Sequence, residues 1–412
     1  MRVAIVGSGV SGLVVAHALH REHEITVFEA DSRIGGHVHT WTVDTANGPV
    51  AVDSGFIVFN ERNYPGLTAL FAELGVASQP TDMSFSVRSD RTGLEYNPQR
   101  LRSLFAQPSN ALRPSFLRML RDVLRFHREA PAALRAGLPG RTLGDFLAAG
   151  NYSREFREDY LQPLCSSLWS MPRTEVLGMA ATFIVRFFEN HGMLSVNDQP
   201  QWRVVRGGSQ TYVRRLIVPF ADRIRTRTPA HVVQRVAGGV LVNGEAFDRV
   251  VFACHSDQAL AALADATPQE RAVLGALPYQ ANDVVLHTDT SVLPRRRAAW
   301  GSWNYHATRD PQEPATLTYN MNMLQGLDTP ETYCVTLNGG AGIDPRRVIG
   351  RVLYHHPRYS LAGFAAQARR GEISGAQQTH YCGAYWGNGF HEDGVASALA
   401  VAREFAGLPV SV

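Results

Sequence analysis

The order of apolar and polar positions divides the chain into segments of different structure. Residues 2–6 form a short apolar run, residues 11–19 repeat apolar side chains at helical spacing, and residues 25–29 are strand-like again. This order of strand, helix and strand is typical of a βαβ unit. Residues 50–59 predict a further strand and residues 66–74 a helix, so the chain opens as an α/β domain.

The strand patterns of the opening segment give way to helical patterns in the middle of the chain and then return. Residues 100–200 indicate helices interrupted by proline and glycine, which predicts a second domain. Strand patterns reappear between residues 202 and 255, and they alternate from about residue 261 to 364 with loops rich in Trp, Tyr, His and Asn. A strand at residues 379–386 and a helix at residues 395–405 close the chain.

Composition narrows the class of protein. With 412 residues, 45% of them hydrophobic and 19% charged, the chain can bury a large core. A formal net charge of +3 makes nucleic acid a poor partner. The four cysteines lack C-x-x-C spacing, which favours a reducing compartment, and no apolar run reaches the roughly 18 residues of a membrane span. The first strand begins at Arg2 and leaves no room for a secretion signal, so we expect a cytoplasmic protein.

A glycine motif lies between the first strand and the first helix. It reads Gly7-x-Gly9-x-x-Gly12, which is the fingerprint of a dinucleotide site when a strand precedes it and a helix follows. Gly7 permits the tight turn, Gly9 lets the backbone approach a pyrophosphate, and Gly12 lets helix and strand pack closely. The amides near Val10 and Ser11 would face the phosphates at the positive end of the helix dipole.

The next strand ends in an acid and is followed by the segment RIGG at residues 33–36. The acid is Glu29, at the position where a carboxylate accepts hydrogen bonds from a ribose. Together these features resemble the extended motif of FAD-containing oxidoreductases of the amine oxidase and phytoene desaturase type. The resemblance implies that Arg33 neutralises the diphosphate, that Gly36 leaves space beneath the flavin, and that Ala30 and His37 lie beside the cofactor.

Three later segments extend this resemblance: VDSGFIVFNERNYPGL near residue 55, HVVQRV with FDRVVFACH, and CGAYWGNGFHEDGVASALAVA near the end. The positions they imply are Gly55, Phe56 and Ile57 beside the flavin, Val233 against the adenine, and Gly383, Asp393, Gly394 and Val395 at the closing helix. A second strand-embedded GxGxxG motif is absent from the sequence, so we expect no dedicated NAD(P)H site.

The resemblance implies an α/β fold in which a Rossmann-like FAD-binding domain carries a discontinuous α+β substrate domain. It assigns residues 1–65, 202–260 and 365–412 to the FAD-binding domain, and residues 66–201 and 261–364 to the substrate domain.

A narrower resemblance covers nearly the whole chain. Segments such as SWNYH, LTYNMN, YHHPRY and YCGAYWGNGFHEDG are similar to a bacterial group described as predicted NAD/FAD-binding proteins. Members of that group accompany cyclopropane-fatty-acid synthase-like methyltransferases, and some resemble desaturases of methyl-branched acyl chains. The resemblance implies that a methyl-modified acyl chain is desaturated by hydride transfer to flavin N5, and it names a lipid methyltransferase as a possible partner.

The sequence also departs from the amine oxidase pattern. Many amine oxidases hold a water near flavin N5 with a lysine, and this chain has none. Ala384 replaces the acid that follows glycine in the closing strand, and either Phe390 or His391 stands where amine oxidases carry an aromatic cage tyrosine. Two alternatives to an acyl-chain desaturase remain. One is an amine or amino acid oxidase, and the other is a non-catalytic flavoprotein partner of a methyltransferase. The electron acceptor stays open between oxygen and another molecule.

The catalytic candidates are Tyr305, His306 and Glu61. The first two belong to a cluster that could share one pocket, or could form a half-buried sheet with satisfied polar tips. The cluster consists of Trp303, Asn304, Tyr305, His306, Tyr319 and Asn320. We expect no metal site, because His37-x-His39 lacks a third ligand and the pair at residues 355–356 is typical of a loop.

An arginine-rich helix is predicted near residues 114–130. Eight arginines between residues 100 and 135 face only two acids, Asp122 and Glu129. Such a helix is either a solvated surface or a surface that meets anionic lipid head groups. The second interpretation would place the protein at the inner face of the membrane as a peripheral protein.

Overall fold

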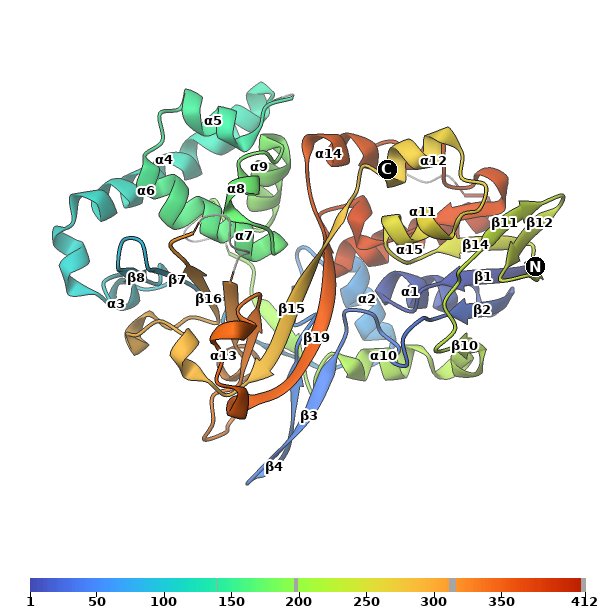
Figure 1. The fold of residues 1–412 in the computed structure, drawn as a ribbon, viewed down its shortest axis with the longest axis horizontal. Helices are drawn as coiled ribbons and strands as arrows, with labels where there is room; N and C mark the ends of the chain where they lie inside the picture. Colours follow the sequence, from blue (N-terminus) through green and yellow to red (C-terminus); the bar gives the residue numbers. More distant parts are fainter. Residues whose placement is uncertain (139, 196–198, 311–315, 409–412) are drawn as a thin grey trace.

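The computed structural model describes residues 1–138, 140–195, 199–310 and 316–408. Its α/β part contains a five-stranded parallel sheet in the order β10-β2-β1-β14-β20 (Figure 1). These strands are β1 (Arg2–Val6), β2 (Glu24–Phe28), β10 (Ile224–Arg225), β14 (Arg249–Phe252) and β20 (Thr379–Tyr381). Strands from three distant parts of the sequence therefore form one sheet.

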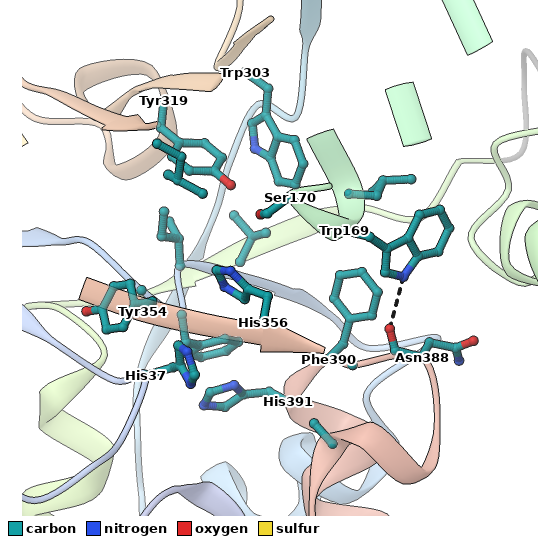
Figure 2. Close-up of a pocket in the computed structure, with 18 of the residues that line it drawn as sticks. His37, Trp169, Ser170, Trp303, Tyr319, Tyr354, His356, Asn388, Phe390 and His391 are labelled. Carbon is teal, nitrogen blue, oxygen red and sulfur yellow. Dashed lines mark hydrogen bonds between the residues drawn. The ribbon is translucent and has the colours of Figure 1, made fainter. Parts of the chain in front are cut away.

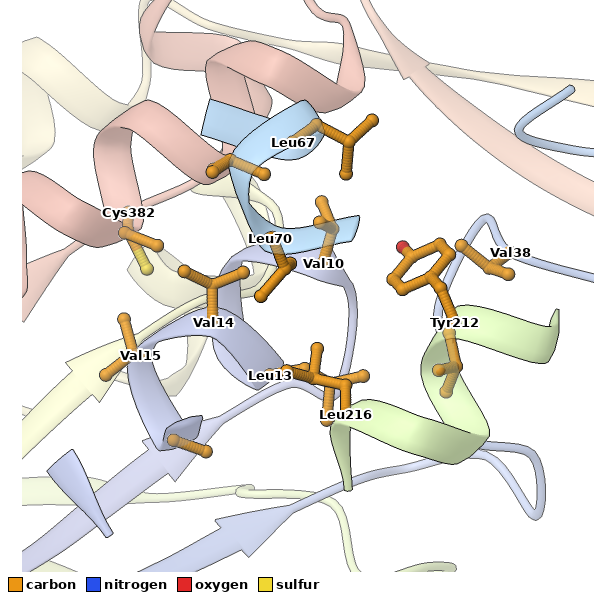
Figure 3. Packing of buried hydrophobic residues seen from close by; sticks show 14 of the residues in the cluster. Val10, Leu13, Val14, Val15, Val38, Leu67, Leu70, Tyr212, Leu216 and Cys382 are labelled. Atoms are coloured by element: carbon orange, nitrogen blue, oxygen red, sulfur yellow. The ribbon is translucent and has the colours of Figure 1, made fainter. Parts of the chain in front are cut away.

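Both faces of this sheet are buried, because alternate side chains of each strand enter different cores. In β1, Val3 and Ile5 pack with the helices on one side, while Ala4 and Val6 pack on the other side. The first side carries α1 (Val10–Leu19), α2 (Pro65–Glu73), α10 (Gln210–Leu216) and α15 (His391–Phe405) (Figure 3). The second side carries β11 (Val233–Val236), β12 (Gly239–Val242), β13 (Glu245–Phe247), α11 (Ser256–Ala262) and α12 (Pro268–Leu274).

A seven-stranded sheet forms the centre of the second part, in the order β19-β15-β18-β17-β16-β7-β8. All neighbours are antiparallel except β16 and β7. The strands are β7 (Phe85–Ser89), β8 (Leu94–Tyr96), β15 (Tyr279–His287), β16 (Trp303–Ala307), β17 (Thr316–Asn320), β18 (Cys334–Leu337) and β19 (Val348–Pro357).

Helices cover one end of this sheet and share a separate core (Figure 1). They are α3 (Leu101–Leu104), α4 (Pro114–Ala136), α5 (Leu143–Ala149), α6 (Arg154–Phe156), α7 (Gln162–Trp169), α8 (Arg173–Val176) and α9 (Ala181–Asn190). None of the helices in the described ranges is both long enough and apolar enough to cross a membrane.

Smaller elements connect the two parts. The hairpin β3 (Thr40–Thr45) and β4 (Gly48–Asp53) projects from the molecule (Figure 1), and a three-stranded sheet joins β5 (Val58–Asn60), β9 (Trp202–Val205) and β6 (Ser78–Pro80). Two further α-helices are α13 (Met321–Gln325) and α14 (Leu361–Gln367).

The predicted α/β fold is confirmed, and three local predictions need correction. The single strand expected at residues 50–59 is two strands, β4 and β5, and the backbone between them bonds to another segment: the Ser54 amide donates to the His39 carbonyl (3.0 Å) and the Phe56 amide to the His37 carbonyl (2.9 Å). The closing helix begins at His391 rather than Val395, and Gly394 inside it packs directly on α1. The pair at residues 355–356 lies in strand β19, not in a loop.

The domain boundaries expected at residues 66 and 261 cut through cores that the structure keeps together. Leu67 and Leu70 of α2 pack against α1 and α15, and Val273 and Leu274 of α12 pack against the parallel sheet. The α/β part therefore includes α2, α11 and α12.

Candidate active site

A cavity of about 1720 Å³ runs from the glycine turn after β1 to the helices above the seven-stranded sheet. Pockets for a single small ligand usually measure about 300–1,000 Å³. The volume is thus sufficient for a large cofactor together with a substrate, and residues from both parts of the molecule line it.

The glycine turn forms one end of the cavity. Gly7, Gly9, Val10 and Ser11 line the wall, and a Cβ built on Gly9 would meet no atom within 4 Å. The N-terminus of α1 has no side-chain cap and no acid in its first turn, so its amides are available to a ligand. An uncapped helix N-terminus behind an open glycine is the arrangement that binds a pyrophosphate.

Glu29 lies beside this turn at the end of β2. Its Oε2 accepts hydrogen bonds from the Ser8 amide (2.9 Å) and the Ser8 hydroxyl (2.6 Å), and its Oε1 accepts one from the Asp31 amide (2.8 Å). These bonds hold the carboxylate at the cavity wall next to Ala30. The position suits a carboxylate that accepts hydrogen bonds from a ribose.

Three glycines let the segments around the turn approach one another. A Cβ on Gly12 would lie 1.9 Å from the Gly7 carbonyl oxygen, one on Gly36 would lie 2.9 Å from the Gly9 Cα, and one on Gly394 would lie 2.8 Å from Val10 Cγ1. Real Cβ atoms do not tolerate such distances. The sequence therefore needs glycine here for packing, independently of any ligand.

The middle of the cavity is bordered by residues 55–57 and by the start of α15. Phe56 stacks on His391, with ring centroids 3.7 Å apart and planes 13° apart. His391 Nε2 forms a 3.0 Å hydrogen bond with the Tyr212 hydroxyl. Burial lowers the pKa of His391 to about 3, so this imidazole is neutral at physiological pH.

Further imidazoles line the same region. The His37 ring lies 5.3 Å from the His356 ring and 6.2 Å from the His255 ring, and His355 lies 5.9 Å from His255. Burial, and then the mutual repulsion of their charged forms, lowers the pKa of His37 and of His356 to about 3 and that of His255 to about 4. No group of three or more His, Cys, Asp or Glu residues in the described ranges is placed to hold a metal ion. The imidazoles of His37, His255 and His356 therefore offer neutral hydrogen-bonding groups.

Aromatic side chains surround the next section of the cavity (Figure 2). Trp303 and Tyr319 face each other across β16 and β17 at 5.1 Å, with their planes 84° apart. Opposite them, Trp169 donates its indole N–H to the Asn388 carbonyl (3.1 Å) beside Phe390. Of the two candidates for the aromatic cage position, Phe390 borders this section, while His391 lies beneath it on Phe56.

The outer section passes between α3, α4 and α7 and is apolar. Its wall consists of Tyr96, Leu101, Leu104, Met119, Leu120, Val123, Leu124, Leu164 and Leu168 together with His127 and Tyr160. Two of these leucines also reach solvent, since Leu101 is 76% exposed and Leu124 63% exposed. The cavity therefore opens to the surface between α3 and α4.

Charged side chains are scarce on this wall. Among the described lining residues, the carboxylates are Glu29, at the glycine turn, and Asp82. No arginine is among these lining residues. Asp82 already accepts hydrogen bonds from the Ser84 amide (2.7 Å) and the Ser302 hydroxyl (3.0 Å). The cavity is thus suited to a neutral, largely apolar substrate.

Most positions predicted for the cofactor lie on the wall: Gly7, Gly9, Val10, Ser11, Glu29, Ala30, Gly36, His37, Gly55, Phe56, Ile57 and Gly383. The roles assigned to them stay predictions. Arg33 lies off the wall because its guanidinium donates to the Val38 carbonyl (2.7 Å). Gly12, Gly394 and Val395 serve the packing of α1 and α15 instead.

Two further cofactor predictions need a different account. The Val233 carbonyl accepts a hydrogen bond from the Ala264 amide (3.0 Å), and Pro229 and Ala230 line the cavity in its place. The Asp393 carboxylate is turned under the preceding loop, where it accepts a hydrogen bond from the Phe390 amide (2.9 Å). Burial raises the pKa of Asp393 to about 6.

The three catalytic candidates lie outside the cavity. Tyr305 is buried with Ala307 and Leu317, His306 pairs with Asp90 (2.7 Å), and the Glu61 side chain is 67% exposed beside Arg203. Trp303 and Tyr305 point to the same face of β16, but Trp303 lies on the cavity wall, whereas Tyr305 packs against Ala307 and Leu317. His356 and Tyr354 also line the cavity, and the sequence pattern does not point to them because it predicts a loop where strand β19 carries them.

The fold and the cavity define a two-part, dinucleotide-binding protein with an adjoining apolar compartment. The family described as flavin containing amine oxidoreductase matches residues 10–322. The chain belongs to this family of FAD-dependent oxidoreductases, and the open glycine turn with its uncapped helix fits FAD.

Solved structures share the fold over nearly the whole chain. Putrescine oxidase bound to putrescine has a TM-score of 0.69 at 15% identity, covering 99% of both chains. Cyclohexylamine oxidase from Brevibacterium oxydans IH-35A has a TM-score of 0.68 at 17% identity, covering 98% of this chain and 99% of that one. The CLA-producing fatty acid isomerase from P. acnes has a TM-score of 0.68 at 14% identity, covering 98% of both chains.

Sequence similarity to curated proteins is more limited. A flavin-containing monooxygenase from Arabidopsis thaliana, FMO GS-OX5, is 35% identical over 68 residues, which are 16% of this chain and 15% of that protein. A second monooxygenase from the same plant is 28% identical over 142 residues, 33% of this chain and 28% of that protein. The match to each of these curated relatives thus spans less than a third of the relative's length.

Proposed function

We propose that the protein abstracts a hydride from a saturated carbon of a lipid acyl chain and leaves a double bond in the product. Bound FAD would supply the hydride acceptor at its N5 atom. The substrate gives up one hydride to the flavin and one proton to a base or a water molecule, and the electrons then pass from the flavin to oxygen or to another acceptor. The residues of this chain would bind and orient the acyl chain and exclude water from it.

The observation that carries this proposal is the chemistry of the outer section of the cavity. An apolar wall formed by α3, α4 and α7 suits an alkyl chain, because each buried methylene contributes about 0.8 kcal/mol. A substrate carboxylate would need a cationic partner, and no arginine lies on the described wall. This argues against an amino acid as substrate. The fatty acid isomerase with the same fold supports an acyl substrate by analogy alone.

The opening of the cavity supports a second element of the proposal, peripheral contact with an anionic lipid surface. Leu101 and Leu124 project at the opening, and Leu112 is 86% exposed nearby in sequence. Arg100 and Arg102 flank Leu101 and form no ion pair with any described residue. Exposed leucines next to unpaired arginines are the combination that binds anionic head groups. We also propose a lipid methyltransferase as partner, on the sequence resemblance alone.

The test is to purify the protein under mild conditions, extract it, and identify the cofactor and any copurifying molecule by mass spectrometry. A bound phospholipid or another esterified acyl lipid, absent from a control extraction of an unrelated protein, is the expected result. Recovery of FAD with an amine and no lipid would instead favour an amine oxidase, the activity named for two of the structural neighbours.

A further inference from the structure

His356 lies between the middle of the cavity and its aromatic section. In Figure 2 it lies between His37 and His391 on one side and Trp303 and Tyr319 on the other. Its ring is stacked 5.3 Å from that of His37. It extends from β19, where it pairs with Gln280 of β15. A side chain here can reach a bound cofactor or a substrate.

A chain of amides fixes the orientation of this imidazole. Asn282 is fully buried, and its Oδ1 accepts hydrogen bonds from Asn338 Nδ2 (2.7 Å) and Gln280 Nε2 (3.3 Å). With its oxygen occupied by two donors, Asn282 turns its Nδ2 toward His356 Nδ1 at 2.8 Å. An amide N–H can only donate, so His356 Nδ1 must accept.

We propose that Asn282 locks His356 in the neutral tautomer protonated at Nε2, and that this Nε2–H donates a hydrogen bond to FAD or to the substrate during hydride transfer. His356 is then a catalytic residue and Asn282 a positioning residue. The role of His356 toward the reaction rests on the proposed function, whereas its tautomer and its effect on bound FAD do not.

The surroundings of the ring support this assignment. In the described part of the chain, Nε2 of His356 has no hydrogen-bond partner, so the proton it carries is available to a ligand. The titratable groups near the ring are His37, His355, His255 and Tyr354, and none of them is an anion at neutral pH that would favour an imidazolium. Burial and the neighbouring imidazoles both lower the pKa of His356, to about 3.

A neutral donor also suits the chain's composition. No lysine is present, so no ammonium group can serve in this cavity, and no arginine lies on the described wall. A fixed, uncharged N–H stabilises charge that develops beside it without needing to reorganise.

The test uses the FAD-loaded protein with ¹⁵N-histidine labelling and long-range ¹⁵N–¹H spectra, with His356→Gln identifying the signal. The proposal predicts an Nε2–H tautomer whose shifts stay constant from pH 5 to pH 9. Asn282→Asp should convert it to an Nδ1–H form or an imidazolium, because a carboxylate only accepts. An Nδ1–H tautomer in the unchanged protein would overturn the proposal.

The second measurement is the reduction potential of the bound flavin, which needs no substrate and so stays valid if the acyl assignment fails. His356→Leu should shift the potential or, if the donor serves the substrate, lower the rate of flavin reduction at least about 10-fold. His356→Gln, whose amide keeps a donor near the Nε2 position, should recover most of the loss. If His356→Leu retains FAD with both the potential and the rate unchanged, His356 has no role in the reaction.

Discussion

Phe56 and His391 lie face to face, with ring centroids 3.7 Å apart, although 334 positions separate them in the sequence. The contact joins the loop after β4 to the first residue of the closing helix. Tyr212 completes the group from α10 through its hydrogen bond to His391. This aromatic group fixes the start of α15 beneath the middle of the cavity.

The stability of the protein should fall as the pH drops below about 6.5. Burial lowers the pKa of His37, His356 and His391 to about 3. Between pH 6.5 and pH 3 these imidazoles are therefore protonated in the unfolded chain but neutral in the folded protein. Each such group costs about 1.4 kcal/mol of unfolding free energy per pH unit in this window. Burial raises the pKa of Asp53 and Asp393 to about 6, and these two act in the opposite direction between pH 3.8 and 6.

The measurement is the free energy of unfolding between pH 7.5 and pH 4.5. His391→Gln should reduce its slope, whereas His231→Gln, a substitution of an exposed side chain, serves as the matched control. An unchanged slope in His391→Gln would show that this imidazole is protonated in the folded protein.

Substitution of Gly9 should abolish FAD binding without unfolding the protein. A side chain at this position enters open cavity rather than protein, so Gly9→Val should retain its unfolding temperature measured without cofactor. The added methyl groups would occupy the space in which the pyrophosphate approaches the backbone. Absorbance of the purified protein measures the FAD content. Gly371→Val, whose Cβ also meets no atom within 4 Å, is the control. Stoichiometric FAD in Gly9→Val would mean that the cofactor lies elsewhere.

The opening between α3 and α4 should carry lipid binding. Leu124→Asp and Leu101→Asp replace exposed side chains, so the protein should fold, yet each should weaken cosedimentation with vesicles of phosphatidylglycerol by about 10-fold or more. Leu353→Asp is the control, because Leu353 is 58% exposed on β19 and does not line the cavity. Equal binding by all three variants and by the unchanged protein would place any membrane contact on another surface.

The outer section of the cavity should set the length of the acyl chain. Leu120 lies on the wall from α4, and Leu120→Trp should shorten the space and shift the preference to shorter chains. Loss of two buried methylenes corresponds to about 1.6 kcal/mol, or more than 10-fold in kcat/KM. Leu117→Trp on the same helix is the control, since Leu117 is 47% exposed and is not part of the wall. A shift of equal size in both variants would argue against this section as the acyl site.

Local sequence signals were sufficient for the first half of the site. The turn after β1 and Glu29 lie next to a strand and a helix that the pattern itself predicts, so their positions follow from backbone geometry. Residues 55–57 were expected beside the cofactor from the family resemblance alone, and the structure brings all of these residues to one wall.

The rest of the site depends on contacts that no local pattern encodes. The Arg33 guanidinium carries the positive charge that could neutralise a diphosphate, but its hydrogen bond to the Val38 carbonyl keeps it away from the cavity wall. His356 could not be distinguished from a loop histidine without the pairing of β19 with β15, which is made across about 70 residues of chain. Tyr305 and Trp303 lie on the same face of β16, and only the packing of α7 decides which of them reaches the cavity.

The most direct test of the central claim is anaerobic reduction of the bound flavin. We predict that methyl-branched or unbranched acyl lipids presented in anionic vesicles bleach the flavin absorbance of the purified protein, while primary amines and amino acids leave it unchanged. Bleaching by amines alone would contradict the acyl assignment and identify the cavity as that of an amine oxidase.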